Sequence, residues 1–258
     1  MTTSTTRSNR LKKLLYLLLS AVFWTALWAF AAKKVGNELL LPTPWQTLTR
    51  LWTLAGTAAF RHAALASILN ILRGFAWGAL CGTLLAIPTA LFLGADTLLS
   101  PLNAIVRATP VASFIILALI WIDSTDVPSF IAFLMVTPIV WSALRTAIRG
   151  IDPQLKEMTR SYRMPFLRRL RYLYLPSVLP SYVTSLTTAL GLAWKAGIAA
   201  EVLCRPKGTI GNHLYESKIY LETTDLFAWT LTVILLSVLM ELSFRLLLRR
   251  LFGKGVTA

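Results

Sequence analysis

Residues 157–176, EMTRSYRMPFLRRLRYLYLP, stand between two strongly apolar blocks and carry five arginines together with several aromatic side chains. The segment ends at a proline, Pro176. So much positive charge in the middle of an apolar chain needs a physical reason, and the rest of the sequence supplies one.

The composition is that of a membrane protein. Of the 258 residues, 56% are hydrophobic and only 14% are charged, and the mean hydropathy is +0.64. Soluble domains carry about 25% charged residues. A net charge of +15 could fit nucleic-acid binding, but membrane proteins concentrate Lys and Arg in their cytoplasmic loops. We therefore expect a lipid bilayer as the surroundings and no nucleic-acid partner.

Six apolar runs approach or exceed the roughly 20 residues that a membrane-spanning helix needs. We expect spans at about 14–32, 72–94, 104–122, 127–147, 177–203 and 226–248. The first run is longer than the apolar region of a signal peptide, so we interpret it as an uncleaved span. The fold class is all-α integral membrane with six transmembrane helices. No linker or internal repeat is visible, which predicts a single transmembrane domain over residues 1–258.

The distribution of basic residues predicts the orientation. With the N-terminus inside, the cytoplasmic segments hold 17 Lys and Arg residues and the outer segments hold seven. This asymmetry favours a multi-pass protein with both termini cytoplasmic. Residues 157–176 then belong to the cytoplasmic loop between the fourth and fifth spans, where positive charge is expected.

A short amphipathic helix is predicted at residues 41–54, LPTPWQTLTRLWTL, where large apolar side chains recur near helical spacing. We interpret it as a helix lying on the outer membrane surface. An ordinary amphipathic connector explains the same pattern.

The sequence contains no pattern for catalysis. A nucleotide-binding P-loop, a nucleophile elbow, an HExxH motif and paired carboxylates are all missing, so we expect no enzyme activity and no catalytic residues. The cysteines Cys81 and Cys204 and the histidines His62 and His213 are scattered, which indicates no metal site.

One acidic residue falls inside a predicted span. Glu201 shares a helical face with Gly197 and Trp194, whereas Lys195 points elsewhere. Ionisable groups inside membranes are costly and often functional. Either Glu201 faces a polar pathway between helices, or it lies near the outer interface and is solvated there.

The basic loop itself is predicted to bend. Residues 154–162 have helical character, and the helix should stop at Arg163–Met164, because the residue before a proline is pushed out of the α region. Pro165 can start a second helix at its first position, and Pro176 should end it. We expect two short helices around a fixed corner; a continuous helix over 154–175 would contradict this. A basic loop resting on anionic lipid headgroups is the alternative.

The spacing in this loop resembles the cytoplasmic loop motif of the permease subunits of binding-protein-dependent ABC importers. That motif is Glu-Ala-Ala, three residues, Gly, nine residues, Ile-x-Leu-Pro. The positions that hold its register are Glu157, Leu173, Leu175 and Pro176. The positions that depart from it are Met158 and Thr159, at the alanines, and Arg163, at the glycine.

Similarity to this family extends over roughly residues 38–250, most closely to its aliphatic sulfonate, taurine and nitrate branch. The segments that carry it are 40–48, 67–94, 108–121, 191–203 and 208–229. Asp123, where the family usually has glycine, and Lys195 are departures.

The resemblance implies a type I ABC importer permease (MetI-like) fold in the bacterial cytoplasmic (inner) membrane. It also implies that two copies form the solute pathway and that the loop at about 150–176 docks as a coupling helix on a separate ATPase subunit. Two such subunits would bind ATP and Mg, this chain would bind no cofactor, and an extracytoplasmic substrate-binding protein would deliver the solute.

The resemblance assigns residues to these roles. The coupling residues are Glu157, Met158, Arg160, Arg163, Met164, Pro165, Leu173, Leu175 and Pro176. The pathway residues, predicted from their shared helical face, are Trp194, Gly197 and Glu201. The solute implied is a small organic or inorganic anion; a heterocyclic vitamin precursor is the alternative within the family. A secondary transporter or channel is the alternative class, which usually shows inverted repeats.

Overall fold

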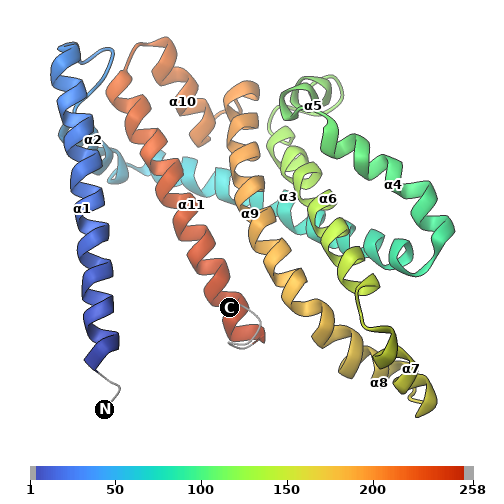
Figure 1. The fold of residues 1–258 in the computed structure, drawn as a ribbon. Coiled ribbons are helices and arrows are strands. Elements are labelled where there is room, and N and C mark those ends of the chain that lie inside the picture. The colour runs from blue at the N-terminus through green and yellow to red at the C-terminus, as the bar shows by residue number, and fades with distance from the viewer. Residues whose placement is uncertain (1–3, 253–258) are drawn as a thin grey trace. The chain divides into compact units, whose positions relative to one another are not determined.

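The computed structural model describes residues 4–252, and within them all regular structure is helical (Figure 1). Both chain ends are predicted to be cytoplasmic. They include residues 1–3 and 253–258, which lie outside the described part. The chain divides into two compact units. One comprises residues up to Phe60 together with His213–Thr232, and the other Arg61–Asn212 together with the residues from Val233 onward.

The first unit contains α1 (Ser4–Val35), a long apolar helix, and α2 (Pro44–Ala55). Helix α2 begins at Pro44 because Thr43 and Gln46 form a reciprocal cap: the Thr43 side chain accepts the Gln46 N–H, and the Gln46 side chain accepts the Thr43 N–H at 2.8 Å. The helix predicted at 41–54 is confirmed, and its place on the membrane surface stays a prediction.

Two chain segments far apart in sequence meet in this unit. The guanidinium of Arg50, in α2, donates to Asp225, in the first turn of α11 (Thr223–Phe252), with one N–O distance of 2.7 Å. This hydrogen bond raises the pKa of Arg50 above its ordinary value. The rings of Trp28 and Phe227 also stack at 5.8 Å. These contacts bind the start of α11 to the N-terminal helices.

The second unit is built on α3 (Ala58–Leu91), α6 (Val127–Arg149) and α9 (Leu175–Cys204). Helices α6 and α9 lie side by side (Figure 1). Three glycines of α3 at four-residue spacing let it approach α6 closely: a Cβ at Gly74 would come within 2.0 Å of the Ser129 carbonyl oxygen, and one at Gly82 within 2.7 Å of that of Thr137. Small residues at this spacing are the usual contact between membrane helices.

The third predicted span, 104–122, is not one continuous helix. It is divided between α4 (Leu93–Ala108) and α5 (Val111–Ala118), whose axes differ by 99°. The break lies at Pro110, which cannot continue a helix, and Thr109 before it is extended, as a residue preceding proline should be. Short helix α5 then packs through Ile115 and Ala118 against α6 and α9.

The other five predicted spans overlap α1, α3, α6, α9 and α11. Among the described residues, five helices are long and apolar enough to cross a membrane, and the bent pair α4–α5 would make a sixth. Helix α9 ends where Arg205 adopts the left-handed conformation, and α10 (Ile210–Ile219) follows it.

Candidate functional site

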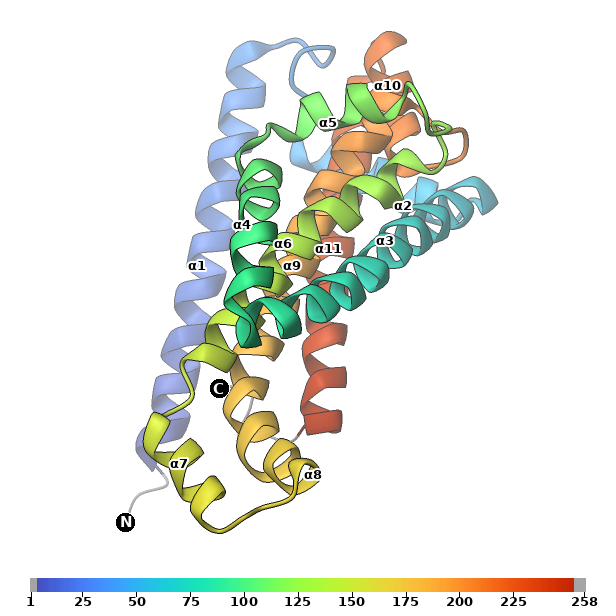
Figure 2. The ribbon, with the colours of Figure 1, turned by 90° about the vertical axis from the view of Figure 1, so that its right-hand side faces the viewer.

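The basic loop forms a sharp corner beyond the ends of α6 and α9 (Figure 2). Its first arm is α7 (Pro153–Ser161), capped by the Asp152 side chain, which accepts the Gln154 N–H at 2.8 Å. Its second arm begins with α8 (Phe166–Arg169). The predicted break in the helix is therefore confirmed.

Arg163 makes the turn by adopting a left-handed conformation, with φ of 47°. The Arg163 N–H donates to the Arg160 carbonyl at 2.8 Å, and the Met164 N–H donates to the Thr159 carbonyl at 3.0 Å. These two bonds define a Schellman motif, in which the residue at the Arg163 position is usually glycine because it has a positive φ. Arg163 thus takes over the conformation for which glycine is preferred, and the adjacent proline does not replace it.

The second arm differs from the prediction. Pro165 is the N-cap and α8 begins at Phe166, one residue later than expected. Pro176 does not end the helix: α8 continues through a π-helical turn, Leu170–Tyr174, directly into α9. A proline normally clashes with the carbonyl four residues before it, and the wider π turn relieves that clash. The corner is therefore one end of a spanning helix, and a displacement of the corner acts directly on α9.

The predicted coupling residues fall into two groups. Leu173 is buried against Trp141, Leu144 and Val178, and Met164 is half-buried. The exposed members are Glu157, Met158, Arg160, Arg163, Pro165, Leu175 and Pro176. The carboxylate of Glu157 makes no hydrogen bond or ion pair with any described residue, so it does not hold the corner together.

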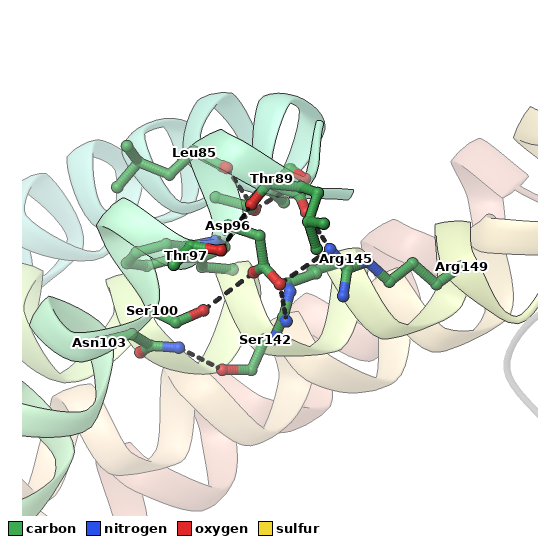
Figure 3. Close-up of polar contacts among 12 residues, drawn as sticks. Leu85, Thr89, Asp96, Thr97, Ser100, Asn103, Ser142, Arg145 and Arg149 are labelled. Carbon is green, nitrogen blue, oxygen red and sulfur yellow. Dashed lines mark hydrogen bonds and ion pairs between the residues drawn. The ribbon is translucent and has the colours of Figure 1, made fainter. Parts of the chain in front are cut away.

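An ionic cluster around the buried Asp96 lies at the base of the corner, and sequence reasoning missed it (Figure 3). Asp96, in α4, is 8% exposed and pairs with Arg145 at 2.6 Å and Arg149 at 2.9 Å, one turn apart on α6. It also accepts a hydrogen bond from Ser100 at 2.9 Å. Since Arg149 is the last residue of α6, the cluster anchors the end from which α7 departs.

Neighbouring polar contacts extend this anchor to α3. The Thr89 carbonyl accepts from Arg149 at 2.7 Å, and its hydroxyl accepts from the Trp141 indole at 2.8 Å. Asn103, in α4, donates to Ser142 of α6 at 2.8 Å (Figure 3). The ends of α3, α4 and α6 are thus joined by hydrogen bonds next to the corner.

Glu201, assigned to the pathway, is completely buried, with 0% exposure. It accepts the Ser67 hydroxyl proton at 2.8 Å and the Gly211 N–H at 3.0 Å. Gly211 must be glycine here, because a Cβ would lie 2.2 Å from the Cβ of Glu201. The interpretation that Glu201 is solvated near the outer interface is therefore wrong.

Trp194 and Gly197 are also buried. The Trp194 indole donates to the Val233 carbonyl at 3.1 Å, and a Cβ at Gly197 would come within 2.6 Å of Ile71. The three residues assigned to the pathway all make contacts inside the chain, and their part in a pathway stays a prediction.

Residues 74–253 match the family model described as the binding-protein-dependent transport system inner membrane component. The chain belongs to this family. It is an ABC importer permease subunit, and the relatives confirm the resemblance found in the sequence. It is 28% identical over 238 residues to the taurine transport system permease protein TauC of Escherichia coli (strain K12), covering 90% of this chain and 86% of that protein.

Two further relatives and a solved structure agree. The putative aliphatic sulfonates transport permease protein SsuC of Escherichia coli (strain K12) is 30% identical over 87% of this permease and 86% of its own length. The bicarbonate transport system permease protein CmpB of Synechococcus elongatus is 27% identical over 59% of this chain and 55% of its own. The crystal structure of an amino acid ABC transporter with histidines matches with a TM-score of 0.62 and 18% identity, covering 80% of this chain and 97% of that one. This last likeness supports the MetI-like permease fold.

Proposed function

We propose that two copies of this permease form the solute pathway and that the corner at 157–176 couples it to two separate ATP-binding subunits. An extracytoplasmic binding protein delivers the solute. In this arrangement the chain spans the cytoplasmic membrane six times, with α4–α5 as one broken span and both termini inside. The observation that carries the proposal is the corner with Arg163 at its turn, whose second arm continues into α9.

The surface of the corner suits a protein partner. Large apolar and aromatic side chains are exposed on both arms, and arginines lie between them. These exposed side chains are Leu155, Met158, Tyr162, Phe166, Leu167 and Tyr172. Exposed apolar patches of this kind mark interaction sites, and aromatic residues and arginine are enriched where proteins bind one another.

The mechanical coupling that we propose depends on the backbone. The Schellman turn sets the backbone at Arg163, Leu173 is buried against neighbouring helices, and α8 passes through the π turn into α9. When ATP binding draws the two ATPase subunits together, the docked corners move with them. Because α8 continues into α9, movement of the corner changes the tilt of α9. The pathway then opens alternately to the two sides of the membrane.

Co-purification with the ATPase subunit tests the proposal. Glu157→Ala removes an exposed carboxylate that contacts nothing in the chain, so the permease should fold normally. We assign Glu157 to the centre of the interface as a hot spot, and truncation of a hot-spot residue costs about 2 kcal/mol or more, so we expect at least a tenfold loss of bound ATPase. Gln154→Ala, on the same helix, is the matched control and should retain it. Full ATPase binding by both Glu157→Ala and a deletion of 157–171 would overturn the proposal.

The solute we propose is a small anion. The supporting observation is that relatives are named for taurine, aliphatic sulfonates and bicarbonate. A thermal-shift screen of the cognate binding protein tests this class: stabilisation by sulfonates or bicarbonate supports it. Stabilisation only by neutral heterocycles would contradict it.

A further inference from the structure

Helix α9 carries a positive charge on its exposed face. Lys195 lies nine residues before the helix end at Cys204, which is about 13 Å along the axis. It is exposed and makes no hydrogen bond or ion pair with a described side chain. An ionised side chain at such a depth is costly against lipid and usually faces a water-filled cavity or a protein partner.

The composition of this face argues against lipid. The exposed residues around Lys195 recur every three or four positions and are mostly small or polar: Thr184, Thr188 and Ala199, with Leu192 as the exception. Between Pro176 and Val202, Leu192 is the one large apolar side chain of α9 that is exposed.

Helix α11 provides the contrast. Its exposed residues in the spanning region include Ile234, Leu235, Val238, Leu239 and Leu242. That is the composition expected for a helix surface in contact with acyl chains. Two long helices of one chain thus expose surfaces of opposite character, and only the surface of α9 suits water.

The buried and exposed faces of α9 also divide the candidate pathway residues. Trp194 and Glu201 are occupied by contacts within the chain, whereas their neighbour Lys195 points away from those contacts. The only ionisable side chain on the exposed face between residues 176 and 203 of the described helix is therefore a cation.

We infer that Lys195 lies in the aqueous solute pathway and attracts the anionic group of the solute, a sulfonate or carboxylate. The Thr184 and Thr188 hydroxyls on the same face donate to carbonyls of their own helix, which leaves the Lys195 ammonium as the charged donor of this surface. An uncompensated ammonium in a narrow aqueous space raises the local concentration of anions. The role in import rests on the proposed function, but water access and anion preference at this face do not need the partner subunits.

Cysteine labelling tests both properties without knowledge of the solute. In a permease with Cys81 and Cys204 replaced by alanine, Ala199→Cys places a thiol one turn from Lys195, about 6 Å along the axis. Membrane vesicles containing the full-length protein are treated with two thiosulfonate reagents of similar size, an anionic ethylsulfonate and a cationic ethyltrimethylammonium. The measured quantity is the ratio of their reaction rates.

We expect the thiol to react with both reagents, and faster with the sulfonate. Replacing Lys195→Gln should lower the anion-to-cation rate ratio by roughly five- to tenfold, from the interaction of two unit charges about 7 Å apart in water. Lys195→Arg should keep the ratio, because it keeps the charge. Leu239→Cys, on the α11 surface, is the control and should react with neither reagent until detergent is added.

Two results would overturn the inference. If Ala199→Cys is as unreactive as Leu239→Cys in vesicles, the face is covered by lipid or protein. If the thiol reacts but the rate ratio is unchanged by Lys195→Gln, the lysine does not select for anions. Both results are independent of ATPase binding by the Glu157→Ala variant, so this inference and the proposed function can fail separately.

Discussion

Replacing Arg163 with glycine is expected to stabilise the coupling corner. Arg163 occupies the position of a Schellman turn that requires a positive φ, which is 47° in this structure. Its side chain is exposed, so the substitution removes no buried contact. The effect is therefore confined to the backbone.

The magnitude follows from the conformation. A side chain with a Cβ in the left-handed region costs about 1 kcal/mol relative to glycine. Arg160→Gly is the control and should have the opposite effect. Arg160 lies three residues earlier, inside α7, where a glycine destabilises the helix by about 1 kcal/mol. The two glycine variants should thus differ by about 2 kcal/mol. Arg163→Val should destabilise the corner, because a β-branched residue tolerates positive φ poorly.

Thermal unfolding in detergent and amide hydrogen exchange measure this effect. For a protein of this size 1 kcal/mol corresponds to about 2–4 °C in Tm, so Arg163→Gly should rise and Arg160→Gly fall by that amount. Protection of the Met164 amide, which bonds to the Thr159 carbonyl, should increase in Arg163→Gly. A lower Tm and a less protected Met164 amide in Arg163→Gly would refute the assigned turn.

Three further substitutions probe the second unit. Asp96→Asn removes the carboxylate that pairs with the half-buried Arg145 and the exposed Arg149, and it should lower the Tm measurably. Ser67→Ala leaves the buried Glu201 without its hydroxyl donor and should cost about 1–3 kcal/mol by the same assay. Gly74→Ala places a Cβ within 2.0 Å of the Ser129 carbonyl oxygen, so α3 and α6 must separate and folded yield should fall.

Each of these substitutions has a matched control. Ser100→Ala removes a neutral donor to Asp96 and should cost about 1 kcal/mol. Thr97→Ala is the control for Ser67→Ala. It removes an exposed hydroxyl that bonds only to a carbonyl of its own helix, and it should be nearly neutral. Gly94→Ala meets no atom within 4 Å and should be neutral or slightly stabilising. Equal effects of test and control variants would contradict the contacts described.

The sequence predicted the helices well because apolar length measures what a bilayer requires. It did not predict that the chain changes direction within 104–122. Pro110 was visible, but the hydropathy of this segment carries no information on the 99° bend. A break at Arg163–Met164 was predictable because Pro165 restricts Met164, but the left-handed turn itself is made by Arg163, at the position where the family motif has glycine. The helical continuation past Pro176 was not, because no pattern announces a π turn.

Contacts between helices were the least predictable part of the site. Asp96 and Arg145 are 49 residues apart, and spacing does not say which helices meet. Two arginines one turn apart on α6 and a single aspartate after an apolar run were the available indications. For Glu201, helical spacing gave the direction of the side chain correctly but not its depth, which depends on Ser67 and Gly211 from other segments.

Photo-crosslinking from the corner tests most directly the claim that this segment couples the permease to an ATPase. A photoreactive phenylalanine analogue at Tyr162, whose side chain is 77% exposed, reports what lies against the corner in intact cells. The account predicts a crosslink to the ATP-binding subunit that is absent from a control placed at the exposed Trp52 of α2. Crosslinks at position 162 to lipid alone, with none to an ATP-binding subunit, would contradict it.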